Sequence, residues 1–151
     1  MPADIIMKYI NENQRVGKMK EILFICTHNS ARSQLAEALI NAFHSNNYKA
    51  YSAGTEKTSI NPYVVKVLSE IGIDASNQWS KTISEFEGKR FDYVVTVCDK
   101  AKETCPFFPG EKIIHKSFSD PSKFEGTEEE ILKQTRIVRD EIKNWLKQNF
   151  N

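Results

Sequence analysis

The sequence predicts an α/β fold in which a four-stranded parallel sheet carries helices on both faces. Short apolar runs alternate with stretches of helical period from about residue 21 onward. The first run, residues 22–25 (ILFI), is apolar at every position, which is typical of a strand buried on both faces. Strands that alternate with helices form right-handed βαβ units, and these units place the helices against a parallel sheet.

Four segments are expected to form the strands. The third is rich in β-branched and aromatic residues (YVVTV), and Gly54 closes the second. In chain order the expected strands are residues 22–25, 49–53, 93–97 and 112–115.

Three helices are expected, and each has its own signals. Apolar residues recur four apart in residues 31–43. The second helix has Asn61 at its N-cap, Pro62 at its first position and Gly72 just beyond its end. The last begins with a capping box at residues 127–130 (TEEE).

Length and charge limit the class of protein. The chain has 151 residues, with 21 Lys and Arg against 20 Asp and Glu, a net charge of +1. We expect residues 20–151 to form a single domain and residues 1–19 to be an N-terminal extension. The charge does not favour a nucleic-acid or membrane partner, and we find neither an apolar run of membrane-spanning length nor a signal peptide. We therefore predict a cytoplasmic protein.

The three cysteines, Cys26, Cys98 and Cys105, are too few and odd in number for a disulfide scaffold. In the cytosol cysteines stay reduced, so chemistry is the more usual reason for such a set. The three histidines have no ligand spacing with the cysteines, and we predict no metal site.

Residues 26–33 (CTHNSARS), the anion loop, connect a buried strand directly to a helix. Unpaired backbone N–H groups and the helix dipole favour an anion at such a place, and the same field lowers the pKa of a thiol. Cys26 is therefore expected to be a thiolate. Arg32 can bind two oxygens of a tetrahedral oxyanion, Ser33 can donate to the sulfur, and Asn29 can fix the loop. The alternative is an inert buried cysteine beside a surface arginine.

Further candidates follow other strands. Cys98 ends the third strand, and Cys105 opens a loop with Pro and Gly after a polar stretch. A short loop can bring two thiols together at little entropic cost; alternatively, Cys98 is core and Cys105 incidental. Asp120 lies in a turn sequence (SDPS), and a carboxyl group there can act as a general acid.

With these motifs the chain resembles the low-molecular-weight protein tyrosine phosphatase superfamily and, within it, the thioredoxin-coupled arsenate reductases. The resemblance runs from about residue 20 to residue 150. It is carried by residues 25–27 (ICT), 29–30 (NS), 32–34 (RSQ), 51–54 (YSAG), 94–96 (VVT), Cys98, 105–106 (CP), 120–121 (DP) and 138–142 (VRDEI).

This resemblance implies a three-layer phosphatase-like fold and assigns roles to residues. Cys26 is the nucleophile, Arg32 the oxyanion ligand and Asp120 the general acid. The oxyanion is held by the loop, at Thr27, His28, Asn29, Ser30, Ala31, Arg32 and Ser33.

In the reductases, arsenate is reduced to arsenite by a thiol relay, here Cys26, Cys98 and Cys105, and thioredoxin regenerates it. No cofactor is bound. Glutathione and glutaredoxin remain an alternative source of electrons, and side phosphatase activity is expected. The first alternative is a phosphotyrosine phosphatase that uses Cys26, Arg32 and Asp120 only. The second is a non-enzymatic oxyanion-binding or redox-sensing module.

The chain departs from the family pattern at a few positions. His28 and Ala31 replace Gly and Cys in the loop, and we expect His28 to need an unusual backbone angle. Some members hold potassium near the positions of Asn29 and Ser52; here Trp79 and Lys81 replace further ligands, so that a lysine ammonium can take the cation's place. Trp79 is expected to be core rather than a wall of the site, as are the phenylalanines at 107 and 108.

Overall fold

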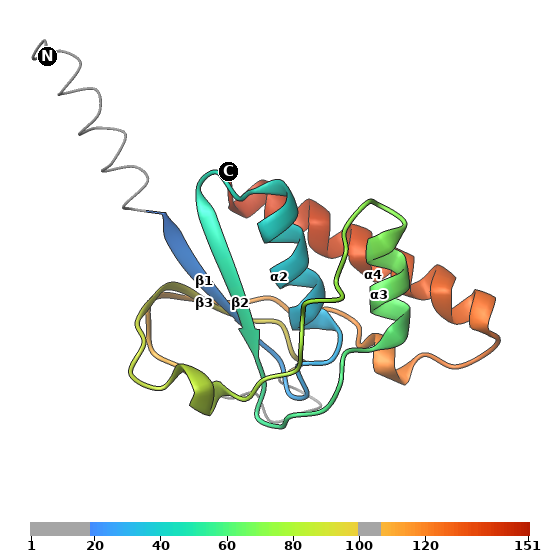
Figure 1. Ribbon diagram of the computed structural model, residues 1–151, viewed down its shortest axis with the longest axis horizontal. Coiled ribbons are helices and arrows are strands. Elements are labelled where there is room, and N and C mark those ends of the chain that lie inside the picture. Colours follow the sequence, from blue (N-terminus) through green and yellow to red (C-terminus); the bar gives the residue numbers. More distant parts are fainter. Residues whose placement is uncertain (1–18, 100–106) are drawn as a thin grey trace, which may run out of the picture.

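The computed structural model describes residues 19–99 and 107–151 (Figure 1). The predicted four strands and three α-helices are present there, together with two short 3-10 helices. In chain order the elements are β1 (Lys20–Ile25), α2 (Arg32–Phe43), β2 (Tyr48–Ala53), α3 (Pro62–Ser69), η1 (Ile83–Phe86), β3 (Phe91–Thr96), β4 (Gly110–His115), η2 (Pro121–Lys123) and α4 (Glu128–Asn149).

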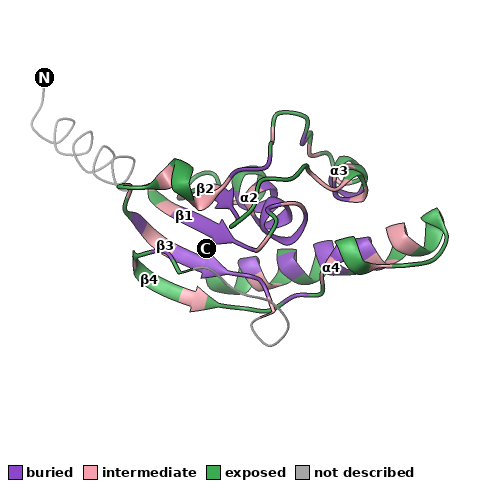
Figure 2. Cartoon of the chain, turned by 90° about the horizontal axis from the view of Figure 1, so that it is seen from below, coloured by how far each residue is buried: buried purple, intermediate pink, exposed green. Residues whose placement is uncertain are grey.

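The four strands form one parallel sheet in the order β2-β1-β3-β4. β1 lies in the interior of the sheet, and its residues Ile22 to Ile25 are completely buried. The edge strand β4 is largely exposed, as the contrast of colours in Figure 2 shows. The continuous apolar run at residues 22–25 follows from this position, because β1 is covered on both faces. The predicted parallel sheet is confirmed.

The two faces of the sheet are covered differently. Ile22 and Phe24 contribute to a core formed with α2, α3 and α4, whereas Leu23 and Ile25 join a smaller cluster with Phe91 on the other face. η1 packs against this second cluster. In the strand order, the chain moves in one direction across the sheet from β1 to β2 and in the opposite direction from β2 to β3. Right-handed crossovers therefore place α2 and η1 on opposite faces. Helices therefore cover both faces, but all three α-helices lie on one.

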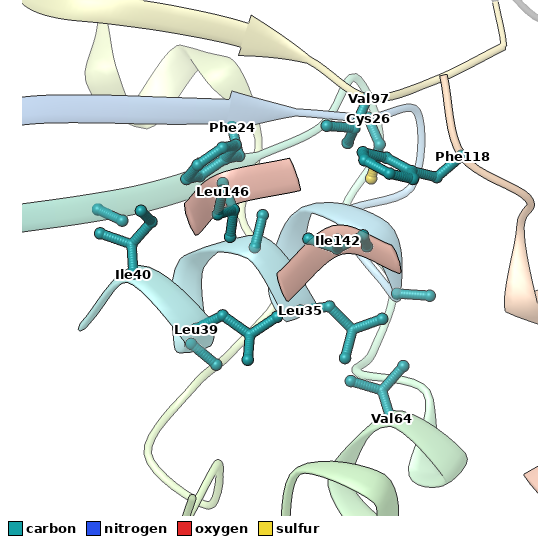
Figure 3. Close-up of a cluster of buried hydrophobic side chains, with 14 of the residues drawn as sticks. Phe24, Cys26, Leu35, Leu39, Ile40, Val64, Val97, Phe118, Ile142 and Leu146 are labelled. Atoms are coloured by element: carbon teal, nitrogen blue, oxygen red, sulfur yellow. The ribbon is translucent and has the colours of Figure 1, made fainter. Parts of the chain in front are cut away.

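The larger core joins α2 and α4 to the sheet. Figure 3 shows Leu35 and Leu39 of α2, with Ile142 and Leu146 of α4, in the same cluster as Phe24 of β1. All five side chains are buried to within one per cent of their area. Each such side chain contributes about 1.5–3 kcal/mol through the hydrophobic effect, so this cluster fixes α2, and with it the start of that helix, against the end of β1.

The helix ends follow the predicted signals. The Asn61 side chain accepts a hydrogen bond from the Tyr63 N–H at 2.8 Å, and Gly72 has a φ of 83° just after α3. The capping box of α4 is formed in both directions between Thr127 and Glu130. None of the helices in residues 19–99 and 107–151 combines the length and apolar composition of a membrane-spanning helix.

Candidate active site

The anion loop leaves the carboxyl end of β1 and is pressed against the residues that follow β2. The Cys26 N–H donates to the carbonyl of Ala53 at 3.2 Å. The Thr27 carbonyl accepts from the N–H groups of Thr55 and Glu56, at 2.9 and 3.1 Å. A Cβ atom on Gly54 would lie 2.5 Å from the Thr27 oxygen, so only glycine permits this contact. The YSAG segment (residues 51–54) at the end of β2 thus shapes the loop.

Asn29 holds the centre of the loop in a left-handed conformation. Its φ of 49° is the only positive φ among the non-glycine residues that the structure describes. Its side-chain oxygen accepts from the Lys81 N–H at 2.7 Å and from Gln34 Nε2 at 3.0 Å, and its Nδ2 donates to Ser33 Oγ at 2.8 Å. The expectation of an unusual angle at His28 is therefore wrong by one residue: asparagine tolerates this region better and secures it with its own side chain.

The Cys26 sulfur lies 2.8 Å from Ser33 Oγ, and both residues are buried. The Ser33 oxygen also accepts from Asn29 Nδ2, and its hydroxyl hydrogen can be donated to the sulfur. A hydroxyl that donates to sulfur favours the thiolate over the thiol. Cys26 is a free cysteine, 2 % exposed, at the start of a helix-leading loop, which suits a nucleophile.

Arg32 and Asp120 meet at the mouth of the loop. Arg32 is the first residue of α2 and is only 2 % exposed, and its Nη2 lies 3.4 Å from Asp120 Oδ2. Asp120 is the N-cap of η2 and accepts from the Ser122 N–H at 3.0 Å, as its turn sequence predicts. The guanidinium and the carboxyl group thus form an ion pair that joins the start of α2 to the start of η2.

A cavity of about 430 Å³ opens beside this pair. Its lining residues are Arg32, Asp99, Ser117, Phe118, Ser119, Asp120, Lys123 and Phe124. Phe118 belongs to the same buried cluster as Cys26, and Figure 3 shows the two close to one another. The cavity therefore approaches the nucleophile from the side of Phe118.

Aromatic residues of the site differ from the expectation. Phe118 and Phe124 line the cavity, although nothing in their local sequence singled them out. Phe108 is core, as predicted, but Phe107 and Trp79 are 73 % and 58 % exposed. The prediction that the last two lie in the core was wrong. Phe107 lies just before the edge strand β4 and Trp79 in a loop beside the anion loop, and neither position is enclosed by apolar side chains.

The remaining loop residues contact the segments that flank the loop. The His28 side chain points to the rim, with Nδ1 2.9 Å from Glu56 Oε2, while its carbonyl accepts from Thr58 Oγ1. The Ser30 carbonyl accepts from the Asn61 N–H at 3.0 Å, and Ala31 is the N-cap of α2. The loop is thereby tied to α3 as well as to β2.

Cys98 follows the strand beside Cys26. The Val97 N–H donates to the Ile25 carbonyl at 2.9 Å, so the ends of β1 and β3 are joined immediately before the two cysteines. Cys98 is completely buried and disulfide-bonded. Cys105 lies outside the described residues.

A buried charged group lies behind the loop. Lys81 Nζ is 3.6 Å from Glu37 Oε1, and Ser52 Oγ donates to the same carboxylate oxygen at 2.7 Å. Burial raises the pKa of Glu37 and lowers that of Lys81, and the charge of each opposes the shift of the other. Because the ammonium already lies beside the Glu37 carboxylate, these oxygens do not fit a bound potassium ion. Glu37 was not identified from the sequence, although it lies four residues after Ser33 and thus on the same helix face.

The fold and the loop define the class of protein. Residues 21–149 match the family described as low molecular weight phosphotyrosine protein phosphatase, and the chain belongs to this family. An arsenate reductase of Halalkalibacterium halodurans is 46% identical over 124 residues, 82% of this chain and 89% of the relative. An arsenate reductase of Bacillus subtilis is 45% identical over 130 residues, 85% of this chain and 94% of the relative.

Solved structures agree with these relatives. An arsenate reductase in the phosphate binding state superimposes with a TM-score of 0.75 at 26% identity, covering 87% of this chain and 97% of that one. A thioredoxin-dependent arsenate reductase of Corynebacterium glutamicum has a TM-score of 0.60 at 26% identity, covering 95% of this chain and 71% of its own. A low molecular weight protein tyrosine phosphatase from T. tengcongensis, at 22% identity and a TM-score of 0.66, shares the fold.

Proposed function

We propose that this protein is an arsenate reductase that works through a relay of Cys26, Cys98 and Cys105. The observation that carries the proposal is the state of two cysteines at adjacent strand ends. Cys26 is a free buried thiol in the anion loop, whereas Cys98 is disulfide-bonded. A phosphatase needs only the first of these thiols. We propose Cys105 as the partner of Cys98, as the resemblance to the thioredoxin-coupled arsenate reductases implies.

In the first step the Cys26 thiolate attacks arsenic. Arsenate, a tetrahedral oxyanion like phosphate, is held by the backbone N–H groups of the loop and by the Arg32 guanidinium. A sulfur–arsenic bond forms and one arsenate oxygen leaves as water after it takes up protons. The Ser33 hydroxyl and the start of α2 stabilise the attacking thiolate.

In the second step the Cys98 thiolate attacks the Cys26 sulfur. A Cys26–Cys98 disulfide forms, the sulfur–arsenic bond breaks, and the electron pair leaves with arsenic, which is reduced from the pentavalent to the trivalent state as arsenite. The Cys105 thiolate then attacks Cys98 and releases Cys26 as a thiolate. The resulting Cys98–Cys105 disulfide leaves Cys26 ready for another substrate. The combination of a free Cys26 and an oxidised Cys98 corresponds to this last state.

The oxidised protein needs an external dithiol. We propose thioredoxin, because a disulfide within a protein is its ordinary substrate and because a structural relative is described as thioredoxin-dependent. We place the reaction in the cytoplasm, where the thiols of the relay are kept reduced.

A phosphatase activity is the second candidate, and the Arg32–Asp120 pair favours it. With Asp120 Oδ2 at 3.4 Å from Arg32 Nη2, a protonated Asp120 can donate to the leaving oxygen of a phosphate ester held on the guanidinium. Cys26 would then form a phosphocysteine that water hydrolyses, with no role for Cys98.

One experiment separates the two candidates. NADPH oxidation is followed with thioredoxin, thioredoxin reductase and arsenate, and p-nitrophenyl phosphate cleavage is measured on the same preparation. Under the relay, Cys98→Ser abolishes arsenate-dependent NADPH oxidation and spares ester cleavage, while Cys26→Ser abolishes both. Arsenate turnover that survives Cys98→Ser would exclude the relay. Rapid ester cleavage without any NADPH oxidation would favour the phosphatase.

A further inference from the structure

The ion pair of Lys81 and Glu37 is a buried charged group that the proposed reaction does not use. The Lys81 side chain is 5% exposed and that of Glu37 12%. Nζ donates to the Trp79 carbonyl at 2.7 Å and lies 4.5 Å from the centroid of the indole ring, which covers it. Ser52 donates to the carboxylate from β2. Glu85 of η1 acts on the ammonium at longer range.

Stability does not explain this pair. Removing two charges from water costs free energy that their mutual attraction only partly offsets, and well-packed apolar side chains often stabilise such a site more. Burial opposes the charged form of each group here, as the raised pKa of Glu37 and the lowered pKa of Lys81 indicate. A charged pair at this place therefore points to a role other than folding.

The backbone and the side chain of Lys81 are both connected to Asn29 through hydrogen bonds. The Lys81 N–H donates to Asn29 Oδ1 at 2.7 Å. The Trp79 carbonyl that holds the ammonium also accepts from Gln34 Nε2 at 2.9 Å. The same Gln34 nitrogen donates to Asn29 at its carbonyl and at Oδ1, each at 3.0 Å. Asn29 in turn donates to Ser33, which contacts the Cys26 sulfur.

We propose that Lys81 is a positioning residue whose ammonium, held by Glu37, acts as a built-in cation that keeps Asn29 and Ser33 in the arrangement that stabilises the Cys26 thiolate and binds the oxyanion. The poor fit of the oxygens around Lys81 to a bound potassium ion has a direct consequence. Because the ammonium already lies against the oxygens of Glu37 and Trp79, added potassium is expected not to change oxyanion binding. The inference rests on the proposed function only where arsenate turnover is measured.

The test uses three variants of the full-length reduced protein. Lys81→Met removes the ammonium and keeps the length of the side chain. Lys81→Met with Glu37→Gln also removes the carboxylate charge, so that no buried ion is left alone. Lys89→Met is the matched control, because Lys89 forms an ion pair with Glu21, at 3.1 Å, at the opposite end of β1.

Two readouts do not depend on arsenate chemistry. The first is the pH midpoint of iodoacetamide alkylation at Cys26, followed by mass spectrometry of the peptide that contains it. The second is the affinity for inorganic phosphate, measured by calorimetry with and without potassium chloride against sodium chloride at equal ionic strength. Thermal unfolding is recorded for each variant.

Lys81→Met is expected to lower the melting temperature, raise the alkylation midpoint by about one pH unit and weaken phosphate binding about tenfold. The double variant is expected to recover the melting temperature but neither the midpoint nor the phosphate affinity. Lys89→Met should match the wild type in both readouts.

Recovery of the midpoint and of phosphate affinity in the double variant would show that Lys81 only supports folding, and would overturn the proposal. Potassium-dependent phosphate binding by the wild type would also contradict it. If Lys81→Met fails to fold, the double variant alone, compared with the wild type in both readouts, decides whether the proposal holds. Failure of arsenate turnover in the wild type, with both readouts responding as expected, would remove the proposed function and leave this inference standing.

Discussion

Replacing Ser33 by alanine tests the central contact of the site. Ser33 is completely buried, and its hydroxyl makes two hydrogen bonds of 2.8 Å, one with the Cys26 sulfur and one from Asn29 Nδ2. A hydrogen bond to a charged group contributes about 1.5–3 kcal/mol. One pH unit in a titration midpoint corresponds to about 1.4 kcal/mol. Loss of the bond to the thiolate should therefore raise the midpoint of Cys26 alkylation by about one to two pH units.

The same change should destabilise the fold. Alanine leaves the Asn29 amide without its acceptor in a buried place, and an unsatisfied buried donor costs about 1–3 kcal/mol. We expect a loss of this size in the free energy of unfolding in urea at pH 7. Thr135→Val is the matched control: it removes one buried hydroxyl, bonded at 2.7 Å to the Ile131 carbonyl within α4.

The control should change stability and leave the alkylation profile as it is. Alkylation is followed at the Cys26 peptide across pH in the reduced proteins. A midpoint shift below about 0.3 pH units in Ser33→Ala, together with the expected loss of stability, would refute the reasoning. It would mean that the hydroxyl accepts from the thiol instead of donating to the thiolate.

Two further changes test the loop support and the helix packing. Gly54→Ala places a methyl carbon 2.5 Å from the Thr27 oxygen, so we expect about 1–3 kcal/mol of destabilisation in urea and a loss of phosphate binding by calorimetry; unchanged binding would show that the anion loop yields freely. Glu70→Gln tests a carboxylate whose pKa is held below its ordinary value by hydrogen bonds from Arg136. A lowered carboxyl pKa contributes stability that is present above the unfolded value and is lost as pH falls through the folded one. The difference in unfolding free energy between the wild type and Glu70→Gln should therefore narrow from pH 7 to below pH 4, and a constant difference would contradict the assignment.

Most of the fold was predictable because its signals are local. The apolar run at residues 22–25, the Asn61–Pro62 start and the capping box at residue 127 each depend on a few neighbouring residues, and each is confirmed. The unequal covering of the two faces was not predictable in this way. It depends on the strand order β2-β1-β3-β4 and on the packing of α3 against α4, which no local pattern contains.

The candidate site likewise has features that local sequence predicts and features that depend on contacts between distant segments. The strand–loop–helix order was sufficient to predict that Ser33 contacts the Cys26 sulfur, because both belong to one short segment. The contact of Arg32 with Asp120 was not predicted: the two residues are far apart in the chain, and only a resemblance had suggested that Asp120 belongs to the site. Glu37 was overlooked because its place in the site depends on its ion pair with Lys81, which belongs to a loop distant in the sequence.

The left-handed turn at Asn29 depends both on local sequence and on contacts with distant segments. A non-glycine residue in this region costs about 1–2 kcal/mol. Four buried hydrogen bonds, from or to Gln34, Lys81 and Ser33, hold it, and each contributes about 0.5–1.5 kcal/mol net. The bonds together outweigh the strain, so the loop is fixed before substrate arrives. Donors that are already in place need no reorganisation when charge moves from the Cys26 sulfur to the oxyanion.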